Sequence, residues 1–407
     1  MMMIEGKNAL VCRFLTVFCL VLALECSTSH ARKGWAPAIF DVTSYGAVAD
    51  AKTDNTMAFQ KAWSEACMWK GRSRVVIPKG TYMLDSIIFR GPCNGPIMFI
   101  IKGVLKAATD PNMFFIDHWI GFRYIDGLVI KGGGSLDGQG SSGWAYNDCF
   151  KNPNCKPLPV SMRLDFVTNS KVHHLRSFNS KNAHFNLFAC NNVNMSHIRI
   201  SAPENSPNTD GIHIGSSTNI RITRSVIGTG DDCISMVSGS QDIKISGVTC
   251  GPGHGISVGS LGRSPKEFVT GIKVSNCTFN GTQNGVRIKT WAPSLASVAS
   301  NLMFQNIFMD NVNNPVIIDQ QYCPQPYCGK DDESAVQISD VTFRNIWGSS
   351  SSKVAVMLKC SGKVPCKNIK LVNIKLAYNG PEGPPSTSSC SNVKGQSFGP
   401  QIPSSCV

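Results

Sequence analysis

The chain has 407 residues, of which 42% are hydrophobic, and its 39 basic and 26 acidic residues give a formal net charge of +13. This composition is typical of a folded protein with a sizeable core and excludes a chain that is disordered throughout. The positive charge predicts attraction to a polyanion, although a basic surface kept for solubility alone is the alternative.

The first segment has the pattern of a cleaved secretory signal. Lys7 and Arg13 lead into the apolar stretch from Phe14 to Leu24, and small and polar residues follow up to Ala31. The apolar run is too short for a membrane span, and no later segment offers about 20 uncharged apolar residues. We therefore expect residues 1–31 to be a signal peptide, residues 32–407 to form a single domain, and the mature protein to be secreted, with no membrane partner.

The expected secretion also helps to decide which polyanion the protein binds. A nucleic-acid partner is disfavoured because the chain is secreted and has neither a clustered basic run nor an RRM-like or helix-turn-helix pattern. An acidic polysaccharide fits an extracellular protein better.

One helix is expected near the start of the mature chain. It covers Thr56 to Lys70, follows the possible caps Thr53, Asp54 and Asn55, and has apolar residues at Met57, Phe59, Ala62 and Trp63. We expect it to cover the open N-terminal end of the fold, where exposed strand edges would otherwise pair with another chain.

A short alternating strand repeats from about residue 172 onward. Its copies begin near residues 172, 193, 220, 243, 272, 302, 336 and 369. Apolar and polar residues alternate within each copy, as in a strand that buries one face. Several copies are followed by a second short strand after a Gly or Asp turn, and the pattern predicts an all-β parallel β-helix. The tail after about Ala377 is expected to cover the C-terminal end.

Aligning the second strands by their apolar pairs places Asp210, Asp232, His254 and Asn284 at equivalent positions. Because neighbouring coils lie about 4.8 Å apart, these residues are expected to form a ladder on one wall, with Asp231 beside Asp232. Alternation turns His213, Ser235, Ser257, Arg287 and Lys289 outward. It would turn Asp210 and Asp232 inward, so a bend at the turn is needed to bring them to the outer face.

Three carboxylates packed this closely repel one another, and we expect at least one to hold its proton near neutral pH. An acid beside a base is what glycosidic hydrolysis needs, with one carboxyl protonating the leaving oxygen and another activating water or attacking the sugar. Arg287 and Lys289 are expected to hold a substrate carboxylate. Each residue alone is more simply a turn or surface residue, and the hypothesis depends on their shared register.

Four motifs in this order resemble the signatures of polygalacturonases, glycoside hydrolase family 28: Asn208-Thr-Asp-Gly-Ile-His, Gly230-Asp-Asp-Cys-Ile-Ser, Cys250-Gly-Pro-Gly-His-Gly and Arg287-Ile-Lys. The similarity extends over nearly all of the mature chain. It implies a right-handed β-helix that hydrolyses α-1,4-galacturonan, the acidic polysaccharide homogalacturonan of pectin, with inversion and without a cofactor or metal. It also implies a monomer of the plant cell wall.

The resemblance assigns roles residue by residue. Asp231 matches the proton donor, Asp210 and Asp232 match the pair that activates water, and His254 matches the histidine that tunes them. The positions that match substrate contacts are Asn208, Arg287, Lys289 and Tyr322. Trp291-Ala-Pro-Ser replaces the Gly-Gly found in many endo-acting relatives, and Tyr322-Cys-Pro with Cys328 resembles pollen-type exopolygalacturonases, so exo action is favoured over endo action.

The cysteines and sequons fit secretion. The chain has 17 cysteines, and removal of Cys12, Cys19 and Cys26 with the signal leaves 14, for which disulfides are the default expectation. Cys233 with Cys250 matches a family disulfide. We also expect disulfides at Cys360 with Cys366, at Cys323 with Cys328, and at Cys390 and Cys406. Glycosylation is expected at Asn194, Asn276 and Asn280.

Two other functions remain open. A Ca²⁺-dependent pectate lyase would share the fold and the substrate, but Arg287 and Lys289 beside the aspartates would weaken cation binding. A non-catalytic binder of wall polysaccharide would keep the basic face without needing the aspartate cluster.

Overall fold

The computed structural model describes residues 36–110, 114, 116–148, 152, 155–324 and 332–407. The expected signal peptide and Cys328 lie outside these residues. No helix among them is long and apolar enough to cross a membrane. Residues Ala38–Val407 form one compact unit, and only this unit is described below.

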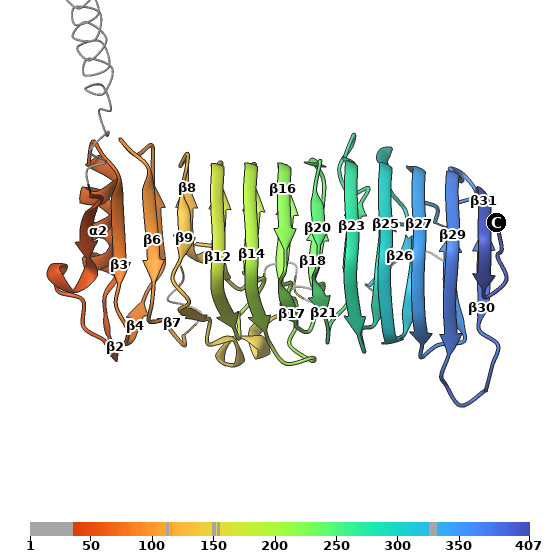
Figure 1. Cartoon of the computed structure of the whole chain (residues 1–407), viewed down its shortest axis with the longest axis horizontal. Helices are drawn as coiled ribbons and strands as arrows, with labels where there is room; N and C mark the ends of the chain where they lie inside the picture. Colours follow the sequence, from red (N-terminus) through yellow and green to blue (C-terminus); the bar gives the residue numbers. More distant parts are fainter. Residues whose placement is uncertain (1–35, 111–113, 115, 149–151, 153–154, 325–331) are drawn as a thin grey trace, which may run out of the picture. The chain divides into compact units, whose positions relative to one another are not determined.

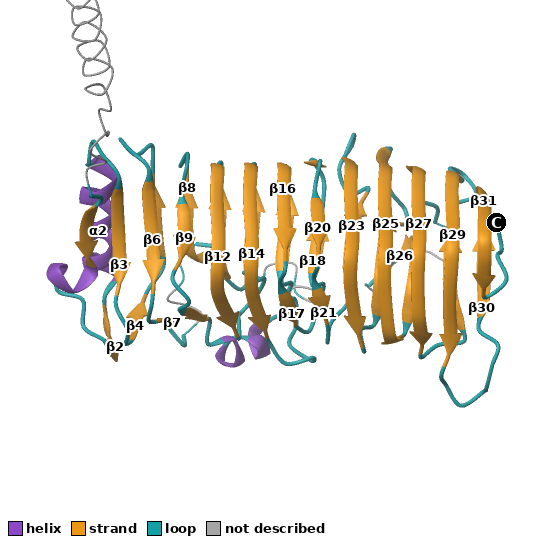
Figure 2. Cartoon of the chain, viewed as in Figure 1, coloured by secondary structure: helices purple, strands orange, loops and turns teal. Residues whose placement is uncertain are grey.

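This unit is a stack of parallel β-coils, with strands side by side along its length (Figures 1 and 2). In the described residues one sheet has 20 strands and the other has 11. Within each sheet, neighbouring strands pair in parallel. The all-β parallel β-helix expected from the sequence is therefore confirmed.

The strands of the first sheet are β1 (Ala38–Asp41), β2 (Asp50–Asp54), β3 (Ser73–Ile77), β4 (Thr81–Leu84), β6 (Ile97–Ile101), β7 (Val104–Ala107), β9 (Val129–Lys131), β10 (Ser135–Asp137), β12 (Thr168–Phe178), β14 (Asn191–Ser201), β16 (Thr218–Thr223), β17 (Val226–Gly228), β19 (Ser240–Gln241), β20 (Lys244–Ser246), β21 (Thr249–Cys250), β23 (Phe268–Asn280), β25 (Ser297–Val312), β27 (Val336–Ser350), β29 (Cys366–Tyr378) and β31 (Val393–Ile402).

The strands of the second sheet are β5 (Ile87–Arg90), β8 (His118–Arg123), β11 (Val160–Asp165), β13 (Phe185–Phe188), β15 (Ile212–Gly215), β18 (Ile234–Met236), β22 (Ile256–Leu261), β24 (Asn284–Trp291), β26 (Asn314–Tyr322), β28 (Val354–Lys359) and β30 (Thr387–Ser391). The described helices are η1 (Val42–Tyr45), α2 (Thr56–Met68), η3 (Gly140–Ser142) and η4 (Trp144–Tyr146).

Helix α2 lies at the N-terminal end of the stack (Figure 1). Its first turn is held by Asp54, whose Oδ1 accepts the backbone N–H of Thr56 at 3.0 Å. Trp63 is buried and packs against Phe89 at 5.1 Å and Phe122 at 5.7 Å between ring centroids. The helix ends at Met68, two residues before the expected end, because Trp69 is already extended.

The solenoid is longer at both ends than the sequence repeat indicated. Coils begin at β1, not near residue 172, since β1 pairs with β3 and β3 with β6. At the other end the tail does not merely cover the stack. Strands β30 and β31 pair with β28 and β29 and form one more coil.

The core lies between the two sheets and is filled by the inward residues of each strand. In the second sheet Ile212, Ile234, Ile256 and Val286 are consecutive partners, and all are fully buried. Truncating one such side chain to alanine is expected to cost about 2–5 kcal/mol of unfolding free energy.

Four disulfides link described cysteines: Cys67–Cys93, Cys233–Cys250, Cys360–Cys366 and Cys390–Cys406. Cys190 and Cys277, by contrast, are buried free thiols. The expectation that every mature cysteine would be in a disulfide is wrong for these two, which fill inward positions of β-coils as small apolar side chains.

Candidate active site

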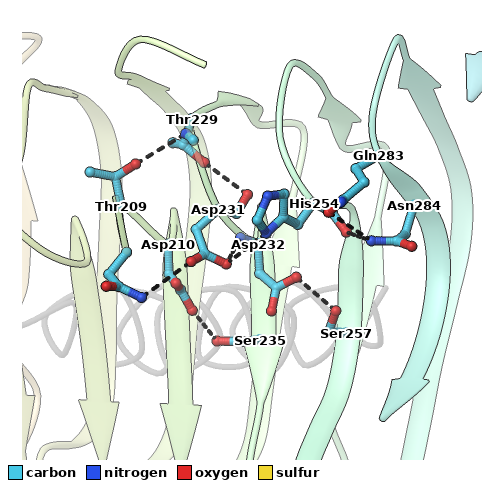
Figure 3. A network of polar contacts seen from close by, with 12 residues as sticks. Thr209, Asp210, Thr229, Asp231, Asp232, Ser235, His254, Ser257, Gln283 and Asn284 are labelled. Carbon is cyan, nitrogen blue, oxygen red and sulfur yellow. Dashed lines mark hydrogen bonds and ion pairs between the residues drawn. The ribbon is translucent and has the colours of Figure 1, made fainter. Parts of the chain in front are cut away.

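The site is built on the turns that precede β15, β18 and β22 and on the first residue of β24. Register pairs Ile212 with Ile234, Ile234 with Ile256, and Ile256 with Val286. The residues two positions earlier, Asp210, Asp232, His254 and Asn284, therefore follow one another coil by coil. Figure 3 shows the three aspartates beside His254.

The bend that the sequence required is present, because the carboxylate of Asp232 meets outward side chains. Its Oδ1 accepts hydrogen bonds from Arg287 Nη2 at 2.7 Å and from Ser257 Oγ at 2.8 Å, and its Oδ2 accepts one from Lys289 Nζ at 2.7 Å. Burial raises the pKa of Asp232, but the charges of Lys289 and Arg287 outweigh it and lower the pKa to about 2. Asp232 is therefore a carboxylate at neutral pH.

Asp210 has the opposite character. Its Oδ2 accepts a hydrogen bond from Ser235 Oγ at 2.7 Å and lies 3.4 Å from His213 Nδ1. Burial, followed by the charges of Asp231 and Asp232, raises the pKa of Asp210, although its contact with His213 opposes the shift. The cluster thus combines a carboxyl group whose pKa is lowered with one whose pKa is raised.

Asp231 lies between these groups and is held from several sides. Its Oδ1 accepts the backbone N–H of Asp232 at 2.7 Å and lies 3.1 Å from His254 Nδ1, and its Oδ2 is 3.4 Å from Asn208 Nδ2. The backbone N–H of His254 also donates to the carbonyl of Asp231 at 2.8 Å.

The turn that carries His254 needs glycine on both sides. Gly253 and Gly255 have φ values of +144° and +87°, and a Cβ at Gly255 would lie 2.2 Å from the carbonyl oxygen of Asn284. The Cys233–Cys250 disulfide ties the coil of the aspartate pair to the strand that leads into this turn. These constraints fix the imidazole against Asp231.

A groove of about 510 Å³ opens over these residues. Its lining includes Asn208, Asp210, Asp231, Asp232, Lys289 and Tyr322. The structure therefore brings together the expected catalytic aspartates and three of the four expected substrate contacts.

Arg287 and Lys289 face outward as expected, but they are not free. Arg287 is 8% exposed and Lys289 is 7% exposed, and both hold Asp232. Arg287 also donates through Nε to Ser257 Oγ at 3.0 Å. The two cations set the charge state of Asp232, a role that the sequence hypothesis did not assign to them.

Several other groove residues had no role in the sequence hypothesis. Arg163 and Asn186 occupy the same outward column as His213 in the two preceding coils, and Arg163 forms ion pairs with Asp117 and Asp165. Strand alternation would have placed Arg163 and Asn186 outward had β11 and β13 been recognised.

The cluster has one feature of a metal site. Asp231, Asp232 and His254 each offer a ligand atom, and these atoms lie within 4.8 Å of one another. However, both oxygens of Asp232 already accept hydrogen bonds from cationic groups. The positive charges of Arg287 and Lys289 oppose a bound cation at this distance.

Comparisons with known proteins identify the family of this chain. Residues 67–406 match the model of glycosyl hydrolases family 28. The chain is 48% identical to an exopolygalacturonase of Platanus acerifolia, covering 90% of this chain and 97% of that protein. It is 45% identical to a polygalacturonase of Gossypium barbadense, with 91% of each chain covered.

Among solved structures, an exopolygalacturonase from Thermotoga maritima shares the fold. It has a TM-score of 0.72 and 17% identity, and the match covers 88% of this chain and 92% of that one. With the family model and these relatives, the chain belongs to glycosyl hydrolases family 28 and is a glycoside hydrolase.

Proposed function

We propose that the protein is a secreted polygalacturonase of the cell wall that hydrolyses α-1,4-galacturonosyl bonds of de-esterified pectin with inversion, as a monomer and from a chain end. The observation that carries this proposal is the convergence of Asp210, Asp231 and Asp232 in one groove, where the pKa of Asp232 is lowered and that of Asp210 is raised. Hydrolysis needs both protonation states at the same bond.

In this assignment Asp231 donates the proton to the leaving oxygen, while Asp210 and Asp232 activate the attacking water. His254, 3.1 Å from Asp231, tunes the donor. The pKa of Asp210 adds a condition. Burial and the neighbouring carboxylates raise the pKa of Asp210, and Asp210 must be ionised when it activates water.

Substrate recognition rests on charge. Lys289 and Tyr322 line the groove, and Lys289 Nζ lies 5.2 Å from the centroid of the Tyr322 ring. A galacturonate carboxylate placed there would be held by Lys289, with Arg287 behind it. Methyl esterification removes this charge, so de-esterified polymer is the expected substrate.

Exo action is supported by the names of relatives such as the exopolygalacturonase of Platanus acerifolia. It is also supported by Asn147, which follows η4 and donates to Asn208 Oδ1 at 2.8 Å, so that a loop borders the groove beside the aspartates. A bordered groove favours a chain end over an internal segment.

A product time course on de-esterified polygalacturonate with chelator present tests the proposal. Saturated monomer from the first time points is the expected result. Early mixed saturated oligomers would replace exo with endo action. Unsaturated products would indicate elimination, and binding without cleavage would indicate a wall-polysaccharide binder.

A further inference from the structure

A column of left-handed residues runs along the bend in the long strands of the first sheet. In the C-terminal coils it consists of Asn276, Asn306, Asn345 and Asn373, with φ between 49° and 54°. The last three each donate through the side-chain amide to the asparagine of the preceding coil, at 3.3, 3.0 and 2.9 Å. Asparagine suits this position because it tolerates positive φ and can bond to its neighbour in the next coil.

Three coils nearer the N-terminus break this pattern. The equivalent positions are His174, His197 and Arg224, with φ of 53°, 54° and 48°. The two imidazoles stack at 4.6 Å between ring centroids. Arginine gains nothing locally from a left-handed backbone and gives up the amide ladder, so these residues point to a role outside the fold.

These residues surround a second cavity. It has a volume of about 290 Å³, and its lining includes His174, His197, Arg176, Arg199 and Arg224 together with the exposed side chain of Val226. None of these residues lines the catalytic groove. The cavity lies on strands of the first sheet, whereas the groove is built on the second.

A basic row extends from the cavity across the same strands. Arg221, Lys244 and Lys273 are exposed and occupy one column over three coils, and Lys171 lies in the same column beyond Asn194, where the expected glycan would separate it from the other three. Strands β12, β14, β16, β17, β20 and β23 contain no Asp or Glu. In the described part of the chain, no basic residue of this face is in an ion pair with a carboxylate.

We propose that this face, comprising the cavity and the basic row and called here the basic face, is a second binding site for a linear polyuronate, separate from the catalytic groove. Cations that recur once or twice per coil match a polymer whose carboxylates recur once per sugar better than they match a single small anion. The stacked imidazoles and the exposed side chain of Val226 offer a surface for sugar rings. The choice of polymer rests on the proposed function. The basic face would keep the enzyme attached to its insoluble substrate.

Binding measurements in an Asp231→Asn background, which prevents cleavage, test this site. The triple variant Arg176→Gln/Arg199→Gln/Arg224→Gln should raise the Kd for long polygalacturonate about tenfold, since three exposed charge contacts each contribute about twofold. The effect should shrink at high salt. The Kd for trigalacturonate, which occupies only the groove, should not change, and this also shows that the variant is folded.

A matched control is Lys367→Gln/Lys370→Gln/Lys375→Gln, which removes three basic side chains from β29 in the same sheet. Equal weakening of polymer binding by both triple variants would overturn the proposal, as would weaker trigalacturonate binding in the arginine variant. Loss of heparin or anionic-vesicle binding with unchanged polygalacturonate binding would identify a different ligand and also overturn it. If the Asp231→Asn chain still cleaves polymer, the proposed catalytic role fails, whereas polymer binding at 4 °C still reports on the basic face.

Discussion

The coils of residues 210–289 and the coils that follow them share one parallel register but differ in what they expose. In the second sheet one outward column runs through His213, Ser235, Ser257 and Arg287 in the first region, then through Ile317 and Met357 in the second. In the second region the conspicuous polar ladder is instead Asn306, Asn345 and Asn373 on the other sheet.

The same backbone therefore supports two uses of polar residues. The asparagine ladder joins neutral amides between coils and stabilises the stack. The aspartate cluster places charges of both signs in the same kind of repeat, at the cost of burying them. This difference predicts that substitutions in the cluster change activity, with or without a loss of stability, whereas those in the ladder change stability alone.

The largest effect is expected for Asp231→Asn. Removing the proton donor should lower kcat about 10²–10⁴-fold with little change in substrate affinity. An aryl galacturonide with a good leaving group should rescue this variant but not Asp210→Asn, because the leaving group then needs no proton. The comparison is made from initial rates on the polymer and on the aryl galacturonide. Rescue of Asp210→Asn alone would make Asp210 the proton donor and assign water activation to Asp231.

Asp232→Ala should reduce both stability and activity. It leaves the buried cations Arg287 and Lys289 without their carboxylate, and breaking such a pair costs about 3–5 kcal/mol of unfolding free energy. Denaturant unfolding measures the loss. Asp319→Ala is the control, because Asp319 lies one coil beyond Lys289 and accepts only a backbone N–H, from Gln321 at 3.0 Å, among its hydrogen bonds in the described residues. Similar losses in both variants would contradict the account.

Asn345→Gly and Asn345→Ala separate the two contributions of the asparagine ladder. Glycine accepts the positive φ but loses two amide hydrogen bonds, a cost of about 1–2 kcal/mol. Alanine should cost about 1–2 kcal/mol more because of its left-handed backbone. Thermal unfolding measures both, and kcat/KM should stay at the wild-type value. Equal stability of the two variants would contradict the cost assigned to alanine in a left-handed backbone.

His184 is expected to have no effect at neutral pH and to give a pH dependence of stability only on acidification. It is fully buried, with Nδ1 2.8 Å from Ser177 Oγ, and burial lowers its pKa to about 3. Between pH 6.5 and 3 the unfolded chain binds a proton that the folded chain does not, so stability falls as the pH falls, by at most about 1.4 kcal/mol per pH unit. His184→Asn should show a shallower decline in unfolding free energy, and an unchanged slope would exclude His184 as the cause.

Strand alternation and coil spacing were enough to predict the β-helix and the ladder of Asp210, Asp232 and His254. They failed for the first coils, where runs such as Ile97–Ile101 are apolar throughout and show no alternation in sequence, although only every second residue is fully buried. The charge states also could not be predicted, because the low pKa of Asp232 depends on Lys289, 57 residues away. The composition gave no indication that Cys190 and Cys277 are not in disulfides.

The most direct test of the catalytic account is the anomeric configuration of the first product, followed by ¹H NMR during wild-type hydrolysis of de-esterified oligogalacturonate. Asp231 and Asp232 approach within 4.8 Å, closer than the roughly 6.5–9.5 Å usual between the carboxyl groups of inverting enzymes, so the stereochemistry is a demanding test. The account predicts that β-galacturonate appears first and then mutarotates. Initial formation of the α-anomer would contradict water activation by Asp210 and Asp232 and would indicate a covalent intermediate.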